Sequence, residues 1–334
     1  MLPASRVLSA IAIGIGLALL VGAGLAPRYL HIDSRLPLDV EHTTFRLVDE
    51  ETGYQHQLHW DLLEPADAES VSVRVGSSTL RESGSGEPAE LVDAEVWAFD
   101  LDRISGQALS TAQLSHTLVT PAAHVDIAGQ WLKFPVDAEK TNYEVFDPTL
   151  RESAPAAFQE VVTVDGVELY RYRQVIEPVN VATKYADQRN TKREEVLAPE
   201  DPAPEDPAPE DPAAEPAEED QSPEQPAMVP GRQLYLHHAA TRDFFVHPRT
   251  GMIVDLHENI DDYYATGEGE RVEDAVVYQA QLAAEDVDKL IVQAESFANA
   301  DTVNTIRYIV LAVGAVITLV ALIGVFGGFR RRSH

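Results

Sequence analysis

The stretch from Ile309 to Phe329 reads IVLAVGAVITLVALIGVFGGF, and it decides the architecture of this chain. Its 21 residues include no charged side chain, and the cluster Arg330–Arg332 follows it directly. A helix of this length spans roughly 30 Å, which is the thickness of the hydrocarbon core of a bilayer. Inside that core a helix satisfies its own backbone hydrogen bonds. We therefore expect a transmembrane helix over residues 308–329 and a basic cytoplasmic tail at 330–334.

A second apolar run, Val7–Ala26, contains 20 uncharged residues and follows Arg6. One interpretation is a retained transmembrane helix over residues 7–26. The other is a signal peptide cleaved after Ala26, because Gly24 and Ala26 are the small residues that such a site uses. The run is longer than the ~7–15 apolar residues of a signal peptide, and Pro27 would hinder cleavage. These two features favour the retained helix.

The positive residues beside the two apolar runs predict the orientation of the chain. Arg6 precedes the first run and Arg330–Arg332 follow the second, so residues 1–6 and the C-terminal tail are expected in the cytoplasm. Residues 27–307 then lie outside the plasma membrane. Small residues at four-residue spacing in the first run would let another helix, or a second copy of the chain, pack closely. They are Ala10, Gly14, Ala18 and Gly22.

The composition limits the partners of the chain. It has 55 acidic against 25 basic residues and a net charge of −30, which argues against nucleic acid as a partner. Membrane lipids are instead the partners that the two apolar runs imply. The chain has no cysteine, which excludes disulfides, thiolate metal sites and cysteine nucleophiles. A soluble, self-repelling body outside the membrane fits this charge.

Residues 27–197 are expected to form the first part of a β-rich ectodomain. Alternating β-branched and aromatic residues predict strands at Thr43–Val48, Ser70–Val75 and Ala94–Asp100. The strongest local pattern is a hairpin of Gln159–Val164 and Val167–Gln174. The two residues between these strands, Asp-Gly, suit a type I′ turn.

Residues 198–226 interrupt this pattern. Ala-Pro-Glu-Asp-Pro occurs three times in succession, and the segment holds eleven acidic residues and no basic one. Proline removes backbone donors and like charges repel, so the segment is unable to form a packed core. We expect a disordered acidic, proline-rich loop.

The ectodomain is expected to resume at residues 227–307. Strands are predicted at Arg232–His238, Asp243–His247, Met252–His257 and Ala275–Leu282. From 285 to 299 the period becomes helical, with one apolar face. That face is made of Val287, Leu290, Ile291, Ala294, Phe297 and Ala298. The helix packs either under the β body or near the membrane surface, and its acidity favours the β body.

No local motif assigns a catalytic, cofactor-binding or metal-binding residue. Gly-x-Ser-x-Gly, His-Glu-x-x-His and the P-loop pattern are absent. His56 and His59 lie three apart in a strand-like context, where they point to opposite faces. His237 and His238 are adjacent and also diverge, and His247 stands alone. We therefore expect a non-enzymatic protein without a cofactor or metal, and its ligand-binding residues stay unknown.

Several short motifs resemble an actinobacterial family of uncharacterised envelope proteins that carries the label porin PorA. They are Lys133-Phe134-Pro135-Val136-Asp137, Lys140-Thr141-Asn142-Tyr143, Phe146-Asp147, Val167-Glu168-Leu169-Tyr170-Arg171-Tyr172 and the run from Phe245 to Asp255. The resemblance implies a membrane-anchored extracytoplasmic protein and brings no catalytic residues. In topology alone, two terminal helices around a β-rich body also resemble the CD36 scavenger-receptor family, whose ectodomains carry lipids through an apolar tunnel.

These observations predict an α+β protein, a β-rich antiparallel ectodomain held by N- and C-terminal transmembrane helices. Three functions stay open for it. The first is binding or passing lipids or other apolar ligands, which a large apolar cavity would support. The second is an oligomeric, porin-like channel, and the third is a structural scaffold that uses an exposed apolar patch.

Overall fold

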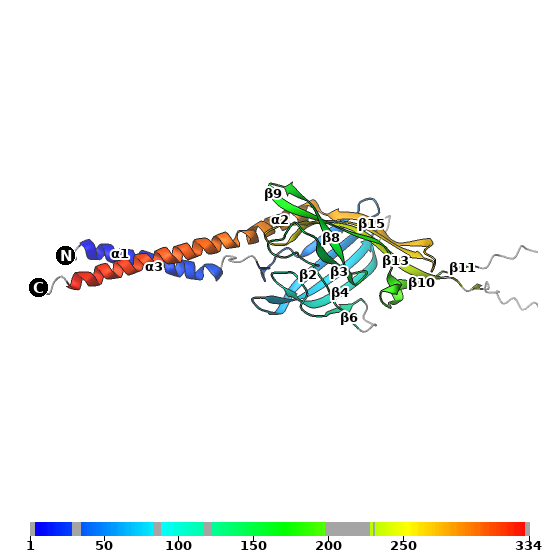
Figure 1. Ribbon diagram of the computed structural model, residues 1–334, viewed down its shortest axis with the longest axis horizontal. Coiled ribbons are helices and arrows are strands. Elements are labelled where there is room, and N and C mark those ends of the chain that lie inside the picture. The colour runs from blue at the N-terminus through cyan, green and yellow to red at the C-terminus, as the bar shows by residue number, and fades with distance from the viewer. Residues whose placement is uncertain are drawn as a thin grey trace, which may run out of the picture. The chain divides into compact units, whose positions relative to one another are not determined.

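The computed structural model describes residues 4–28, 35–82, 88–116, 122–194, 196–197, 228–229 and 231–330. The acidic segment expected to be disordered at 198–226 lies outside the described residues, as do residues 1–3 and 331–334. The described part is an antiparallel β domain with long helices near the two ends of the chain, which confirms the α+β class (Figure 1).

The main sheet has thirteen strands, all of which pair with antiparallel neighbours where a register is given. Their order is β6-β5-β4-β3-β2-β1-β15-β14-β13-β9-β8-β7, and β10 also pairs with β13. The bounds are β1 Thr44–Val48, β2 Tyr54–Ala66, β3 Ser70–Arg81, β4 Glu90–Asp102, β5 Ala112–Ser115, β6 Ala123–Val125, β7 Tyr143–Asp147, β8 Glu152–Val164, β9 Val167–Asn180, β10 Thr191–Arg193, β13 Gln233–Val246, β14 Ile253–Ala265 and β15 Arg271–Leu282. A separate two-stranded pair joins β11 (Val196–Leu197) and β12 (Met228–Val229).

The predicted β8–β9 hairpin is present. Asp165 has φ 51° and Gly166 has φ 85°, so both central residues of its turn have the positive φ that a type I′ turn requires. Val164 pairs with Val167 directly beside the turn. Asp-Gly between two alternating runs was therefore enough to predict this hairpin from the sequence.

One strand prediction was wrong in its bounds. Arg232–His238 and Asp243–His247 were expected as two strands, but β13 runs without interruption through both. Its side chains alternate in burial, and the buried positions include the polar residues His238 and Arg242. Because polar residues occupy inward positions, the apolar alternation that sequence reasoning relies on breaks in the middle of the strand.

The chain divides into two compact units. The first comprises Met1–Ile176, Ala240–Asn259 and Tyr278–His334, and the second comprises Glu177–Ala239 and Ile260–Val277. The second unit contains two short 3-10 helices, at Val181–Thr183 and Gln188–Asn190. It also carries a stacked pair of rings, since His237 lies 5.4 Å from Tyr263 with an interplanar angle of 11°.

Aromatic side chains fill the interior of the first unit. The rings of Trp97, Trp131 and Phe146 lie within 5.8 Å of one another, centroid to centroid. A second group places Phe134 against Tyr172 at 4.8 Å. Beside these rings, the backbone of Gln130 is hydrogen-bonded to β7 and forms a bridge to Gln107, which follows β4. This part of the β body is therefore a packed core.

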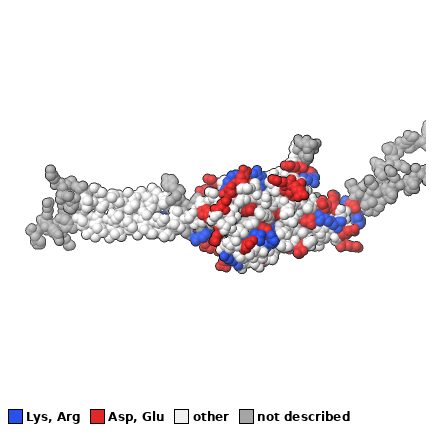
Figure 2. All heavy atoms as spheres, turned by 90° about the horizontal axis from the view of Figure 1, so that it is seen from above, with Lys and Arg blue, Asp and Glu red and all other residues white. Residues whose placement is uncertain are grey.

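The two long helices α1 (Ala4–Leu25) and α3 (Ala300–Arg330) pack antiparallel against each other (Figure 1). A Cβ on Gly16 would overlap Thr318 Oγ1 and lie 2.9 Å from the Gly314 carbonyl oxygen, so glycine permits this close approach. Further along, the Arg307 Nε donates to the Ala23 carbonyl at 3.0 Å. By length and composition both helices are able to cross a membrane, and they are almost free of charge in Figure 2.

The small-residue stripe expected on the first helix is not the face that contacts α3. A Cβ added at Gly14 or Gly22 would meet no atom within 4 Å. Gly16, which lies off that stripe, makes the contact with α3 instead. The expectation of a further helix or a second copy against the stripe stays a prediction.

The predicted amphipathic helix is α2, Ala284–Ala298, and it ends one residue before α3 begins. Its buried residues include Leu290, Ile291, Ala294 and Phe297, the expected apolar face. Arg46 on β1 pairs with Glu285 in its first turn at 2.9 Å. The helix therefore packs on the β body, as its acidity suggested.

Candidate functional site

Two of the motifs that carry the family resemblance meet in the structure. The segment 133–138 lies along the turn 247–251, which joins β13 to β14. Phe134 N donates to the Gly251 carbonyl at 2.7 Å, and Ala138 N donates to the Pro248 carbonyl at 2.7 Å. Gly251 has φ +70°, and a Cβ there would overlap the backbone of Phe134. The close pairing of these segments therefore requires glycine at 251.

Helix α2 is fastened to the same turn. His247 is nearly fully buried, and its Nε2 lies 3.1 Å from Glu295 Oε1 on α2, while its Nδ1 lies 3.1 Å from Thr250 Oγ1. Burial lowers the pKa of His247, and the Glu295 carboxylate acts in the opposite direction. The imidazole thus links the motif turn to the helix that continues into α3.

The side chain of Gln293 on α2 binds the backbone of the segment that follows α1 in the sequence. Its Oε1 accepts hydrogen bonds from the backbone N–H groups of Glu41 and His42, at 3.1 and 2.9 Å, and its Nε2 donates to the His42 carbonyl at 3.1 Å. The amide of Gln293 thus pairs with the backbone N–H and C=O groups of this segment, as a neighbouring strand would. Gln293 therefore joins α2, which precedes α3, to the segment between α1 and β1.

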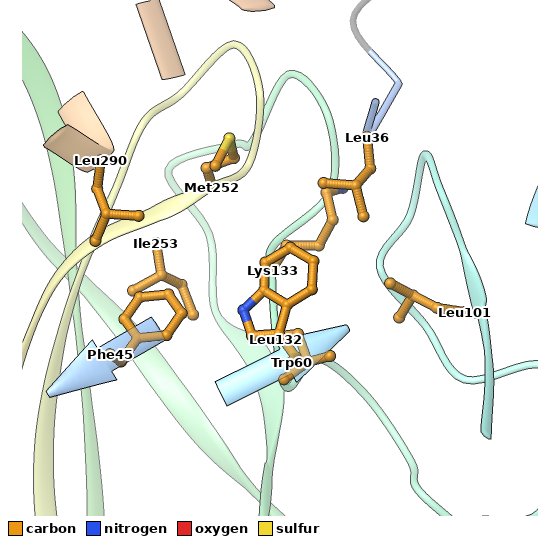
Figure 3. Close-up of a pocket in the computed structure, with 9 residues that line it drawn as sticks. All are labelled: Leu36, Phe45, Trp60, Leu101, Leu132, Lys133, Met252, Ile253 and Leu290. Atoms are coloured by element: carbon orange, nitrogen blue, oxygen red, sulfur yellow. The ribbon is translucent and has the colours of Figure 1, made fainter. Parts of the chain in front are cut away.

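A small apolar cavity lies where these parts meet (Figure 3). Its volume of about 10 Å³ gives room for about one water molecule. It is lined by Leu36, Phe45, Trp60, Leu101, Leu132, Lys133, Met252, Ile253 and Leu290. Lys133 and Met252 belong to the two motifs, Leu290 lies on α2, and Leu36 lies on the segment between α1 and β1.

Two polar groups border this apolar lining. Trp60 on β2 is 3% exposed, and its indole Nε1 has no hydrogen-bond partner among the described residues. Lys133 is also 3% exposed, and its Nζ donates to the Ile104 carbonyl at 2.8 Å. Burial lowers the pKa of Lys133 to about 7, although the negative charge of Asp102 acts against this shift. A buried amine and an unpaired N–H are unusual in a packed interior and mark a candidate ligand site.

A second polar cluster, the Arg242 network, lies inside the first unit. Arg242 Nη1 donates to Asp147 Oδ2 at 2.6 Å and to Gln174 Oε1 at 3.1 Å, and Nε donates to Glu258 Oε1 at 2.8 Å. All four side chains are buried. Burial alone would lower the pKa of Arg242, but the charges of Asp147 and Glu258 raise it above its ordinary value.

Glu258 is held from the other side by two further residues. Its Oε2 lies 3.0 Å from His56 Nδ1 and accepts from the Tyr278 hydroxyl at 3.1 Å. Burial would raise the pKa of Glu258, but His56 and Arg242 lower it to about 2. The Glu258 carboxylate is thus ionised and fully bonded, which is the arrangement of a structural ion pair.

The histidines considered from the sequence do not come together. His56 bonds to Glu258 and Ser77, whereas His59 bonds to Thr44 and Asp61. His238 Nδ1 lies 2.5 Å from Asp262 Oδ1 in the second unit. Among the described residues, no group of three His, Asp or Glu side chains is placed to hold a metal ion.

No local sequence pattern marks Trp60 as a site residue. Lys133 did stand out inside a motif, but nothing in its neighbours along the chain indicates that its amine is buried. The residues that enclose it come from β2, β4 and α2, so only the tertiary fold brings them together.

The fold and the site together define a class of proteins in which a β-rich body is attached to an antiparallel pair of long apolar helices. Within this class the chain belongs to a known family, because the family model described as Porin PorA matches residues 8–323. This confirms the resemblance drawn from the motifs. The family names and the two apolar helices together indicate a membrane protein of the cell envelope.

Two curated relatives carry the name Porin PorA. One, from Corynebacterium amycolatum, is 26% identical over 141 residues, covering 40% of this chain and 36% of the relative. The other, from Corynebacterium resistens, is 24% identical over 230 residues, covering 62% of this chain and 55% of the relative. The matches thus span about a third and about half of the relatives' own lengths.

Among solved structures, the crystal structure of P47 of Clostridium botulinum E1 aligns with a TM-score of 0.11 and 6% sequence identity. The alignment covers 83% of this chain and 87% of that chain. A score this low carries no argument about the fold.

Proposed function

We propose that this member of the family is a non-enzymatic envelope protein whose β body binds the apolar chain of a lipid or related amphiphile. The observation that carries the proposal is the composition of the cavity wall. It is apolar except for the Trp60 indole and the Lys133 amine, and it includes Leu36 from the segment between α1 and β1, Leu290 from α2, and residues of both family motifs. Binding sites for small apolar ligands have this mixture of apolar wall and few polar groups.

The cavity is close along the chain to both membrane helices. Leu290 lies on α2, which is separated from α3 by Asn299 alone. Leu36 follows the short helix η1 (Ala26–Arg28) by eight residues, a distance of at most ~30 Å in extended chain. The cavity wall is thus connected along the chain to both apolar helices.

The cavity is closed in this structure. Its volume of about 10 Å³ is far below the ~300 Å³ at which ligand pockets begin, so binding requires side chains at the wall to move. Leu36 is the candidate, because it lies outside the regular strands and helices, at the start of a described segment. Leu36 is held by a reciprocal pair with Arg103, from Leu36 N to the Arg103 carbonyl and from Arg103 Nε to the Leu36 carbonyl.

Native mass spectrometry of the full chain, released from lipid nanodiscs, tests the proposal. Leu36→Trp fills the cavity, and Leu38→Trp is the matched control because Leu38 is 46% exposed. We expect adducts of lipid mass on the unmodified chain and on Leu38→Trp, and at least a tenfold lower adduct fraction on Leu36→Trp. Equal adducts on all three chains, or none on any, would contradict binding at this site.

The relatives' name supports a second candidate function, an oligomeric channel. Aromatic side chains fill the described interior of the first unit, so a pore would have to form between membrane helices of several copies. Thr318 does not line such a pore readily, because its hydroxyl donates to the Gly314 carbonyl of its own helix at 2.8 Å. Conductance of the same preparation in planar bilayers distinguishes the two functions, and stepwise single-channel currents would favour the channel.

A further inference from the structure

We propose that the cavity selects amphiphiles with an anionic headgroup, whose oxygen atoms accept from the Trp60 indole N–H and whose charge is neutralised by Lys133. This inference rests on the proposed function, and it adds the chemical class of the ligand. The class is shared by long-chain carboxylates and by alkyl phosphates, and the experiment below separates these two sources.

The first observation is the orphaned indole nitrogen. Trp60 is buried by the fold, and an indole can only donate. Nearly all buried polar groups in proteins are paired, so an unpaired donor at a cavity wall indicates an acceptor that the described side chains do not supply. In Figure 3 the nitrogen lies on the side of Phe45 and Ile253. A ligand oxygen within reach of this nitrogen would supply the missing acceptor.

The second observation is the incomplete neutralisation of Lys133. An ammonium group has three donors, and the described residues offer its Nζ one acceptor, the Ile104 carbonyl. No carboxylate among the described residues lies within ion-pair distance of Lys133 Nζ. The carboxylate that acts on the pKa of Lys133 is that of Asp102. Its Oδ1 already accepts hydrogen bonds from Ile104 N and Ser105 N, at 2.9 and 2.6 Å. The amine therefore lacks a counter-charge that an anionic headgroup would provide.

The two observations reinforce each other because the groups belong to one wall. In Figure 3 the Lys133 side chain runs towards Leu36, and Trp60 lies across the same cavity. The other lining residues are apolar and suit an alkyl chain, whereas a small hydrophilic anion would gain nothing from them. An anionic amphiphile satisfies the indole, the amine and the apolar wall together.

The proposal predicts the direction of a pH effect. With a pKa of about 7 in the free protein, Lys133 is largely uncharged above neutral pH. A bound anion favours the charged amine, so binding raises this pKa and takes up a proton above pH 7. Affinity for an anionic amphiphile should therefore fall between pH 7 and 9, while affinity for a neutral one should not change.

The test uses the full chain in neutral detergent, titrated with oleate, dodecyl phosphate and the neutral glyceryl monooleate. Isothermal titration calorimetry at pH 6.5 and pH 8.5 gives each dissociation constant and the proton uptake. At pH 6.5 we expect one or both anions to bind at least tenfold more tightly than the neutral amphiphile. At pH 8.5 this difference in affinity should be smaller. Preference for oleate alone assigns a carboxylate headgroup, and preference for dodecyl phosphate alone assigns a phosphate.

Two variants and one control locate the effect. Lys133→Met should make the affinities for the anionic and the neutral amphiphiles about equal, and it should abolish proton uptake on binding. Trp60→Phe should weaken oleate and glyceryl monooleate alike by several-fold, because both present acceptor oxygens, and it tests the site independently if Lys133→Met does not fold. Lys140→Met is the matched control, since Lys140 is exposed and lies outside the cavity wall; it should leave the difference in affinity unchanged.

The outcomes separate this inference from the proposed function. Equal affinity for anionic and neutral amphiphiles, unaffected by Lys133→Met, would overturn the charge selection and leave apolar binding intact. Absence of binding for all three amphiphiles would overturn both and identify the cavity as a site for water alone.

Discussion

At the scale of single residues, Arg242 is the side chain on which the interior of the first unit depends most. Its guanidinium contacts two buried carboxylates and one buried amide, and all its partners lie on different strands. We predict that Arg242→Met lowers the free energy of unfolding by about 3–5 kcal/mol, because it leaves Asp147 and Glu258 buried without their counter-charge. Denaturant unfolding of the detergent-solubilised chain, followed by tryptophan fluorescence, measures this loss.

Arg173→Met is the control for that prediction. Arg173 also forms a bidentate ion pair, with Asp243, but its side chain is 42% exposed. An exposed ion pair contributes at most about 1 kcal/mol. If both variants lose the same free energy, burial of the Arg242 network is not what makes it important.

The same residues explain which parts of the molecule the sequence could predict. Asp165 and Gly166 act through their own backbone, so a local pattern was enough to place that turn. Arg242 and His238 are polar residues at inward positions of β13, and their partners are distant in the chain, so local alternation misplaced the strand. The site residues Trp60 and Lys133 depend on tertiary burial in the same way.

At the scale of elements, the antiparallel contact of α1 and α3 bears on whether the first apolar run is retained. We predict that the chain with Ser9→Cys and Gly324→Cys forms a disulfide between these positions, since a Cβ on Gly324 would lie 3.1 Å from Ser9 Oγ. The chain has no other cysteine, so loss of both thiols to maleimide labelling after mild oxidation reports this bond directly. A mature chain that begins at Pro27 would lack residue 9 and keep a free thiol at position 324.

A pair of glycine variants shows whether the crosslink reflects specific packing. Gly16→Leu should reduce the yield strongly, because a side chain there overlaps Thr318. Gly14→Leu should have little effect, because its Cβ would enter open space. Equal yields in the two variants would mean that the helices associate without the close contact at Gly16.

At the scale of the whole molecule, function depends on the side of the membrane on which the β body lies. The acidic residues of the chain outnumber the basic ones by thirty, whereas α3 ends at Arg330 and is followed along the chain by Arg331 and Arg332. Basic residues near a membrane helix stay in the cytoplasm, while acidic segments have little influence on orientation. The expected arrangement is therefore a cytoplasmic tail and a β body outside the plasma membrane.

Single cysteines test this orientation in intact cells. We predict that Glu168→Cys, on the exposed side of the β8–β9 hairpin, reacts with a membrane-impermeant maleimide, and that Ser333→Cys reacts only after permeabilisation. The unmodified chain, which has no cysteine, is the background control. The reverse labelling would place the Lys133 cavity in the cytoplasm. Its amphiphile would then come from the inner leaflet, and a role in passing lipids across the envelope would be excluded, even if the binding constants stayed the same.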